Sequence, residues 1–311
     1  MKTLYLECNM GAAGDMLMAA LYELLEDKQG FLDTMNGLGL PGVRLEAQPA
    51  STCGIAGNHM AVTVDGQEET EPAAPESAGQ DHLHHGEEHH HHDHEHEHGH
   101  EHEHGHSHDH DHDHGEEHHH HHHHATPGHI GAMIDSLPLP EEVKTHARGV
   151  YDAIAQAEAK AHGCPVGDVH FHEVGALDAV ADVVGVCYAL HLLQPDQILV
   201  SPVHVGSGTV RCAHGIMPVP APATANLLAG VPIYGGTVRG ELCTPTGAAL
   251  LTHFAQSFGP MPVMTAQAVG VGIGTKTFEQ ANCVRAFLGE TAGEANGEIL
   301  ELVCNIDDMT P

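Results

Sequence analysis

Residues 3–15 read TLYLECNMGAAGD, and this stretch decides the fold class. Residues 3–8 have the alternation of a strand, residues 9–14 form a glycine-containing turn, and Asp15 opens an apolar run typical of a helix through about Leu25. A strand, a turn and a helix in this order predict a fold that combines both kinds of element. The same arrangement also aims backbone N–H groups at an anion.

The turn itself therefore has two interpretations. Gly11, Gly14 and Asp15 could form part of an anion site at the start of the helix. An ordinary tight turn uses the same glycines, and Asp15 also fits an N-cap residue whose carboxylate accepts backbone N–H bonds. The residues leave both interpretations open.

Outward from this stretch, the same two periodicities recur along the chain. Strands are expected at residues 43–47, 59–64, 198–205, 282–288 and 299–305. Helices are expected at residues 141–162, from just after Asp178 to Leu193, at residues 224–228, and from the segment 244–247 through Phe254. Residues 270–274 read GVGIG without a following helix, which favours close backbone packing over a dinucleotide motif. We predict an α+β fold, a mixed α/β arrangement of helices and strands.

One segment departs from this pattern. Between His82 and His124 lie 25 of the 35 histidines, interleaved with Asp and Glu, and residues 67–127 hold few large apolar side chains. Such a segment cannot bury enough surface to offset the entropy of ordering. We predict a disordered insertion over 67–127, between two parts of one α/β core.

The resulting domain division has four parts. They are a first part of the core at 1–66, the insertion at 67–127, a second part of the core at 128–297, and the start of a truncated C-terminal domain at 298–311.

The insertion has the chemistry of a metal collector. Neutral imidazole is a borderline-soft ligand that suits nickel, zinc, copper and cobalt, and the carboxylates add oxygen donors. The segment should therefore collect divalent transition metal. Its composition does not say whether that metal is stored, sensed or used.

Charge and patterning exclude several classes of protein. Ten Lys and Arg against 43 Asp and Glu give a formal charge of −33, which argues against a nucleic-acid partner. Residues 1–25 lack the order of a signal peptide, and the apolar stretch 174–193 contains two Asp and one His, which indicates a buried helix rather than a membrane span. The eight scattered cysteines predict free thiols. We expect a cytoplasmic protein.

Candidate metal ligands gather in the second part of the core. His170 and His172 are two apart, so in a strand both imidazoles project from one face, and Glu173 follows at once. Asp178 and Asp182 are an i, i+4 pair on the next helix. The full candidate metal set is His170, His172, Asp178, His204 and His214. Structural, hydrogen-bonded histidines explain the pattern equally well.

Positively charged side chains are scarce in this chain, so an arginine near a candidate site is informative. Arg211 lies beside a glycine-rich loop and is a candidate ligand for a phosphate or carboxylate, although a surface ion pair is equally compatible. Thr244 and Thr246 fit a helix cap and could also hold a phosphate.

Five segments together carry a resemblance to a known family. They are YLEC and GAAGDM within 5–16, HFHEVGALD at 170–178, HGIMPVPAPAT at 214–224, TPTGAAL at 244–250 and NIDDMTP at 305–311. In this order they resemble the LarC family of nickel-insertion proteins. The segments span nearly the whole chain outside the histidine-rich stretch.

The resemblance implies an activity. LarC proteins insert Ni²⁺ into pyridinium-3,5-bisthiocarboxylic acid mononucleotide, forming two Ni–S bonds and one Ni–C bond, with CTP hydrolysis coupled to the reaction. The product is the nickel-pincer cofactor of lactate racemase. The resemblance therefore implies a nickel chelatase of the lyase class, with Ni²⁺ as cargo and the lactate racemase apoprotein as recipient.

It also suggests roles for residues. Forming the Ni–C bond removes a ring proton, so a base is needed, and His172 or Glu173 is the candidate. The loop of Gly11, Gly14 and Asp15 could hold the substrate's phosphate together with Arg211.

Family members continue past the NIDDMTP segment into a domain that binds CTP, for which Mg²⁺ or Mn²⁺ is expected. The resemblance implies that this domain is missing here. A separate C-terminal fragment then becomes an expected partner, and the shortened chain is expected to lack full activity alone.

Two other functions remain in view. The chain could be a non-catalytic nickel store or metallochaperone whose function lies wholly in the histidine-rich segment. It could also be a metal-dependent phosphohydrolase built on His170, His172 and Asp178.

Overall fold

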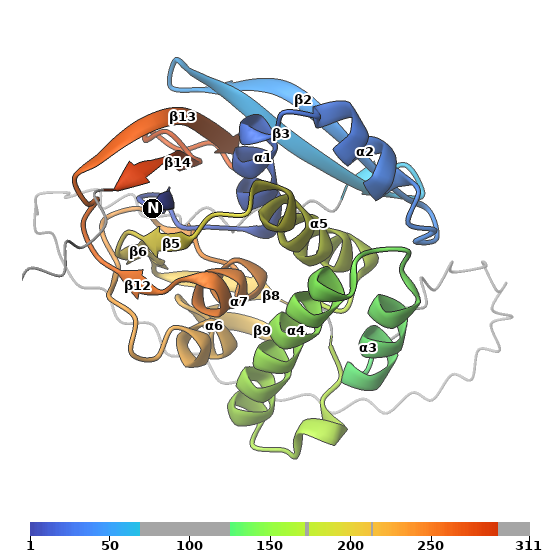
Figure 1. Cartoon of the computed structure of the whole chain (residues 1–311). Helices are drawn as coiled ribbons and strands as arrows, with labels where there is room; N and C mark the ends of the chain where they lie inside the picture. Colours follow the sequence, from blue (N-terminus) through green and yellow to red (C-terminus); the bar gives the residue numbers. More distant parts are fainter. Residues whose placement is uncertain (69–124, 172–173, 213, 292–311) are drawn as a thin grey trace, which may run out of the picture. The chain divides into compact units, whose positions relative to one another are not determined.

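The computed structural model describes residues 1–68, 125–171, 174–212 and 214–291, and these residues form a mixed arrangement of helices and strands (Figure 1). The predicted fold class is therefore confirmed. The helices are α1 (Gly14–Leu24), α2 (Lys28–Asn36), α3 (Pro127–Ser136), α4 (Glu141–His162), α5 (Leu177–Leu193), α6 (Pro222–Leu227) and α7 (Pro245–Phe254), with a 3-10 turn η1 at Val166–Asp168.

Most strands belong to one sheet of eight, in the order β12-β5-β1-β14-β13-β3-β2 with β4 added beside β3. They are β1 (Lys2–Glu7), β2 (Val43–Thr52), β3 (Ile55–Val64), β4 (Gln67–Glu68), β5 (Gln197–Val200), β12 (Ser257–Phe258), β13 (Met264–Ile273) and β14 (Cys283–Thr291). β1 lies parallel to β5 and antiparallel to β14, so the sheet is mixed.

Three two-stranded sheets complete the described part of the chain. They pair β6 (Val203–His204) with β10 (Ile233–Tyr234), β7 (Gly206–Ser207) with β11 (Gly240–Glu241), and β8 (Thr209–Cys212) with β9 (Gly215–Pro218). The strand expected over 198–205 is thus divided into β5 and β6. Residues 201–202 separate them, and Pro202 there has no N–H for a ladder bond.

Helix α1 lies directly on β13, and glycine makes this possible. A Cβ atom at Gly270 would lie 2.0 Å from the Ala20 carbonyl oxygen, and one at Gly272 would lie 1.8 Å from that of Met16. Both distances are far below van der Waals contact, so only glycine fits. The prediction that the GVGIG run serves close backbone packing is confirmed.

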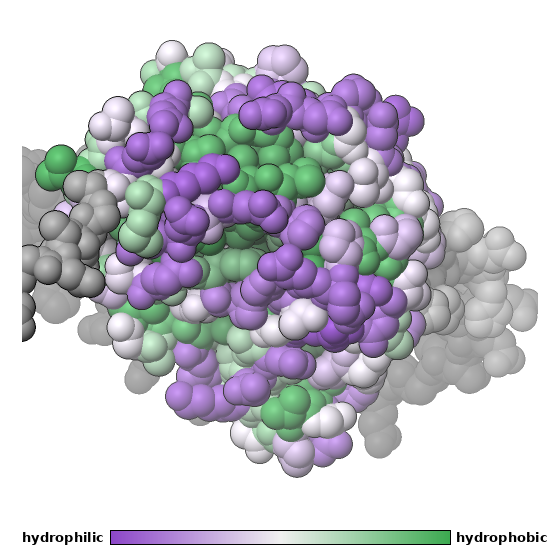
Figure 2. Space-filling view, viewed as in Figure 1, coloured by the Kyte–Doolittle hydropathy of each residue, from purple (hydrophilic) through white to green (hydrophobic). Residues whose placement is uncertain are grey.

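A buried aromatic cluster joins α1, α2 and α5. Phe31 is 1% exposed, and its ring stacks on that of Tyr188 with the centroids 5.7 Å apart. The centroid of the Tyr22 ring lies 5.9 Å from that of Phe31. Apolar side chains of this kind fill the core. On the face seen in Figure 2, hydrophilic side chains cover most of the surface and apolar ones show in patches.

We expect the change Phe31→Ala to lower the free energy of unfolding by about 3–5 kcal/mol, because it removes a buried ring and leaves a cavity. Urea unfolding followed by circular dichroism measures this loss. Val263→Ala is the control, because Val263 is 97% exposed and should change stability by less than about 0.5 kcal/mol. Equal effects of the two changes would contradict this packing.

The structure also locates the ends of the predicted insertion. Gln67 and Glu68 pair with β3, Ala125 forms a bridge with Phe171, and the Thr126 side chain caps α3. Ordered structure therefore extends a little into 67–127 at both ends. Residues 69–124 lie outside the described residues, as does the predicted strand at 299–305 within 298–311.

Two further expectations can be compared with the described residues. All seven cysteines among them are free thiols, as predicted. The apolar stretch at 174–193 contains the largely buried helix α5. None of the helices in the described part of the chain has the length and apolar character that a membrane span requires.

Candidate functional site

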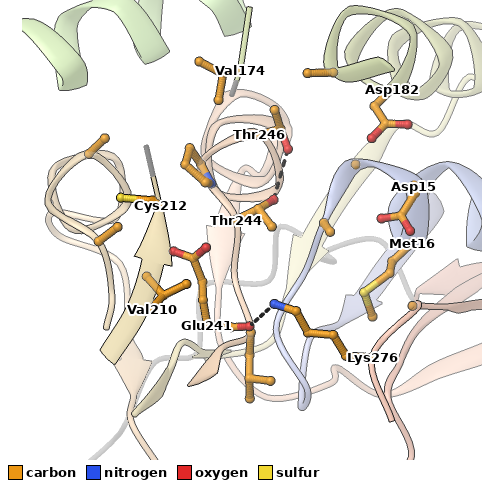
Figure 3. A pocket seen from close by; sticks show the side chains of 18 of the residues that line it. Asp15, Met16, Val174, Asp182, Val210, Cys212, Glu241, Thr244, Thr246 and Lys276 are labelled. Carbon is orange, nitrogen blue, oxygen red and sulfur yellow. Dashed lines mark hydrogen bonds between the residues drawn. The ribbon is translucent and has the colours of Figure 1, made fainter. Parts of the chain in front are cut away.

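A cavity of about 410 Å³ opens where α1, α4, α5, α7 and the β8–β9 hairpin meet (Figure 3). Its volume lies within the range of roughly 300–1,000 Å³ that small-molecule sites occupy. The charged and imidazole side chains in its lining are Asp15, Glu68, Glu158, His162, Asp178, Asp182, Arg211, His214, Glu241 and Lys276.

Two loops form the floor by hydrogen bonding to each other. The N–H of Ala12 donates to the Leu242 carbonyl at 3.0 Å, and the N–H of Thr244 donates to the Ala12 carbonyl at 3.0 Å. Gly11 has a φ of +77° and touches Leu242, while a Cβ at Gly247 would lie 2.1 Å from the Ala12 oxygen. These glycines therefore bring the starts of α1 and α7 to one cavity.

Carboxyl groups lie beside the first N–H groups of α1. The Asp182 carboxyl lies beside the N–H of Asp15, and the Asp15 carboxyl lies beside the N–H of Met16. Asp182 packs so closely on Gly14 that a Cβ there would lie 2.6 Å from the Asp182 Cβ. The helix start thus holds two of the protein's own carboxylates.

His59 lies next to the Asp15 carboxylate. His59 Nδ1 lies 3.9 Å from Asp15 Oδ2 and 3.1 Å from the Ile273 carbonyl, and His59 Nε2 lies 2.7 Å from Glu68 Oε1. Both ring nitrogens of His59 therefore face an oxygen atom. Burial lowers the pKa of His59, but the bonds to Glu68 and Ile273 and the charge of Asp15 outweigh it and raise that pKa.

Burial has the largest effect on the pKa of two carboxyl groups on this wall, those of Asp15 and Asp182. It raises the pKa of Asp15 to about 6, against the opposing effects of the Met16 N–H and of His59. Burial, followed by the charges of Asp15 and Asp178, raises the pKa of Asp182 well above its ordinary value. The Oδ1 atoms of Asp178 and Asp182 are buried without a hydrogen-bond partner in the described structure.

The opposite wall comes from the β8–β9 hairpin and the end of α4. Arg211 and Cys212 lie on β8, and His214 follows in the turn. The His214 ring lies 4.8 Å from that of His162, whose Nε2 is 3.4 Å from Glu158 Oε2. This wall therefore offers a guanidinium and two imidazoles to the cavity.

Donors for an anion lie at the start of α7. The Thr244 hydroxyl accepts from the N–H of Gly247 at 3.1 Å and lies 3.0 Å from the Thr246 hydroxyl. Lys276 is close by, its Nζ donating to the Glu241 carbonyl at 3.2 Å (Figure 3). Thr244 is the helix cap that the sequence predicts.

Two of the candidate metal ligands lie away from the cavity lining. His204 is 4% exposed, with Nδ1 2.9 Å from the Asn9 carbonyl, Nε2 3.0 Å from the Gly235 carbonyl, and its ring stacked on Tyr234. It therefore ties β6 to the turn after β1. His170 is exposed and precedes Phe171, which pairs with Ala125.

Asp178 and His214 do line the cavity, from α5 and from the β8–β9 turn. Within the described residues, however, no three His, Cys, Asp or Glu side chains are grouped so that they could hold a metal ion. The candidate bases His172 and Glu173 lie outside the described residues. Their neighbour Val174 lines the cavity, and its carbonyl accepts from the Tyr151 hydroxyl at 3.1 Å.

Several side chains in or beside this cavity have no signal in the sequence. Glu68 and Lys276 line it and His59 lies next to Asp15, and all three are single residues on strands or loops, with no motif around them. Asp182 was noticed only as a neighbour of Asp178 in helical spacing. A lone histidine in a strand gives no signal, because its partners Asp15 and Ile273 are distant in the sequence.

Comparison with known proteins identifies the family. The family described as "Nickel insertion protein" matches residues 4–311. The chain belongs to the nickel insertion protein family. The match includes all described residues that line the cavity, so the site lies within the family's shared sequence.

Its curated relatives in this nickel insertion family are longer. A "Putative nickel insertion protein" of Geotalea daltonii is 37% identical, with 100% of this chain and 67% of the relative aligned. Proteins of Desulfitobacterium hafniense and Staphylococcus epidermidis, each named "Pyridinium-3,5-bisthiocarboxylic acid mononucleotide nickel insertion protein", are 36% and 35% identical. The chain covers 66% and 65% of their lengths. No solved structure matches the chain.

In this nickel insertion protein, the described residues that flank the histidine-rich segment can be placed relative to the cavity. Glu68, the last described residue before it, lines the cavity. Ala125, the first described residue after it, pairs with Phe171, three residues before the cavity-lining Val174.

Proposed function

We propose that this chain holds a pyridinium-3,5-bisthiocarboxylic acid mononucleotide in the cavity and takes part in inserting nickel into it. The observation that carries the proposal is the lining of the cavity. Carboxylates stand on the wall of α1 and α5, and anion donors stand at the start of α7 and on β8. Two relatives are named for this reaction.

The substrate's phosphate belongs on the donor side. Thr244, Thr246 and the N-terminal end of α7 offer hydroxyl and N–H groups, and Lys276 and Arg211 add positive charge. Gly11 and Gly14 contribute by holding the α1 loop against this end, which modifies the phosphate role that the sequence suggested for them.

The ring proton needs an acceptor on the carboxylate side. When nickel bonds to the ring carbon, the C–H bond breaks and its proton goes to a base. Asp15 suits this task because its pKa of about 6 leaves it ionised at neutral pH, and His59 stands beside it at 3.9 Å. His172 and Glu173 remain the alternative base that the sequence suggests.

Nickel reaches the cavity from the histidine-rich segment, whose flanking residues Glu68 and Ala125 lie at or near the cavity. His170, His172, Asp178 and His214 are the candidate ligands on this route, and His204 serves the fold. Binding of CTP, with Mg²⁺ or Mn²⁺, belongs to the C-terminal part present in the longer relatives. The completed cofactor is then transferred to a lactate racemase apoprotein.

The test supplies that part in trans. The chain is mixed with the C-terminal third of a relative, Ni²⁺, CTP and the mononucleotide, and the nickel-containing product is measured by mass spectrometry. We expect product only when both protein parts are present. Absence of product with both parts present contradicts the proposal, and a relative's full chain serves as the positive control.

We expect removal of residues 81–124 to leave insertion intact at ample Ni²⁺ and to abolish it when Ni²⁺ is scarce, because the segment raises the local supply of metal. The insertion rate is measured across a range of buffered free Ni²⁺ concentrations. Loss of insertion at saturating Ni²⁺ would place the chemistry in the segment. A chain that binds Ni²⁺ but does not insert it would favour the alternative function of a nickel store.

A further inference from the structure

His59 on β3 has a carboxyl group near each of its two ring nitrogens. Its Nδ1 atom lies 3.9 Å from Asp15 Oδ2 on α1, and its Nε2 atom lies 2.7 Å from Glu68 Oε1 on β4. The His59 side chain is 13% exposed, so water screens these interactions only in part. Asp15 and Glu68 line the cavity of the candidate site, whereas His59 lines a neighbouring cavity of about 340 Å³ with Cys53 and Lys276. A ligand in the first cavity would therefore contact Asp15 or Glu68, and His59 would act on it through them.

The backbone around His59 is held by Glu23 of α1. Glu23 Oε1 accepts from Asn58 Nδ2 at 2.6 Å, and Glu23 Oε2 accepts from the N–H of Val271 at 2.8 Å. These bonds join α1 to both β3 and β13, at the point where Asn58 pairs with β13. The His59 ring also lies 3.1 Å from the Ile273 carbonyl, measured from Nδ1. The position of the ring relative to α1 is thus fixed by three elements.

The contacts of His59 also determine its charge. Burial lowers the pKa of His59, but the hydrogen bonds with Glu68 and the Ile273 carbonyl and the charge of Asp15 outweigh burial and raise that pKa above its ordinary value of about 6.5. The pKa of Asp15 is about 6. His59 therefore carries a positive charge over the pH range in which Asp15 gains its proton.

The groups around Asp15 differ in the direction of their effects. Burial has the largest effect and raises the pKa of Asp15. The Met16 N–H and the charge of His59 lower it, and the charge of Glu68 raises it. Asp182 stands on the same wall (Figure 3), and burial raises its own pKa well above the ordinary value, which favours its neutral form. Without the charge of His59, Asp15 would keep its proton up to a higher pH.

We propose that His59, held by Glu68, is a positioning residue that keeps Asp15 as a carboxylate on the cavity wall at neutral pH. The use of this carboxylate as the base for the ring proton rests on the proposed function. The new element is a residue outside the cavity lining that sets the pH range in which the base can accept a proton. A carboxyl with its midpoint near neutral pH would be ionised in only about half of the chains.

Carbon-13 NMR of the whole chain, labelled at the side-chain carboxyl of aspartate, follows this ionisation without nickel or substrate. The Asp15 signal is the one that is absent from Asp15→Asn. We expect its midpoint at about pH 6 in the unchanged chain and about one pH unit higher in His59→Gln, because the nearby positive charge is lost. His59→Lys restores a positive charge and should return the midpoint toward that of the unchanged chain.

His191→Gln is the matched control. His191 Nδ1 lies 3.0 Å from Glu142 Oε2, so it is also a histidine beside a glutamate, but neither residue lines the cavity. This change should leave the Asp15 midpoint in place, and circular dichroism verifies that each variant is folded. An unchanged midpoint in His59→Gln, or equal midpoints in His59→Gln and His59→Lys, would overturn the proposal.

The insertion rate gives a second readout, which a purely structural role would not move in the same way. In the two-part assay, the fall in rate at low pH should shift upward with the Asp15 midpoint. His59→Gln should therefore be about threefold slower than the unchanged chain at pH 6.5 and within about twofold of it at pH 8.5. A rate lowered equally at both pH values would overturn the proposal, because His59 would then serve only the fold.

The two measurements separate this proposal from the proposed function. An Asp15 midpoint that depends on His59, without product in the two-part assay, supports the role of His59 and contradicts the proposed function. Product with a midpoint that His59→Gln leaves unchanged does the reverse.

Discussion

Asp15→Asn is expected to lower the rate of nickel insertion by about 100-fold or more, because a positioned base contributes a factor of this size to proton transfer. The amide keeps the shape of the carboxyl but cannot accept the ring proton. Single-turnover insertion by the chain, with the C-terminal third of a relative in trans, measures the rate. Asp152→Asn, on the exposed face of α4, should leave it unchanged.

The pH dependence separates this role from a structural one. Because the pKa of Asp15 is about 6, the wild-type rate should fall as pH drops through about 6, and the variant should lack this fall. A carboxyl whose pKa rises on folding costs stability above that pKa and none below its unfolded value. The variant should therefore be as stable as the wild type, or more stable, at pH 8.

A retained rate in Asp15→Asn would contradict the assignment. If Glu173→Gln or His172→Gln then abolished insertion, the base suggested by the sequence would be correct. Thermal unfolding at pH 8 shows whether a slow variant is still folded.

Gly272→Ala is expected to destabilise the fold by more than about 3 kcal/mol, because the new Cβ would lie 1.8 Å from the Met16 carbonyl oxygen and 2.7 Å from the Ala20 nitrogen. Both contacts are backbone atoms of α1, so the helix must move away from β13. Chemical denaturation measures the loss. Because α1 carries Asp15, insertion should fall as well.

Gly131→Ala is the control, since nothing lies within 4 Å of a Cβ at that position in α3. Replacing a helical glycine by alanine there should stabilise the protein by up to about 1 kcal/mol. A stable Gly272→Ala variant would mean that α1 does not lie against β13 as described.

The local pattern of the sequence was enough to predict α1, α4 and the close packing of the glycines in β13. Their signals are periodicity and glycine spacing, which depend only on neighbours in the chain. Helix α2 was missed although Phe31 and Met35 are four apart and both buried, because its other side chains are mostly polar. Tertiary packing of two residues forms that helix.

The site was harder to predict, because its partners come from distant segments. Asp15, Arg211 and His214 were identified from their local sequence, and all three line the cavity. His204 has the same residue type as a ligand, but two backbone carbonyls occupy its ring nitrogens, which no spacing rule reveals. The unpartnered oxygens of Asp178 and Asp182 emerge only from burial in three dimensions.

The most direct test of the central claim is a crystal structure of the chain with the pyridinium mononucleotide bound. We predict that the ring lies in the cavity between Asp15 and Asp182, with the phosphate at Thr244 and Thr246. A mononucleotide bound outside this cavity, or in it with the phosphate against Asp182, would contradict the account.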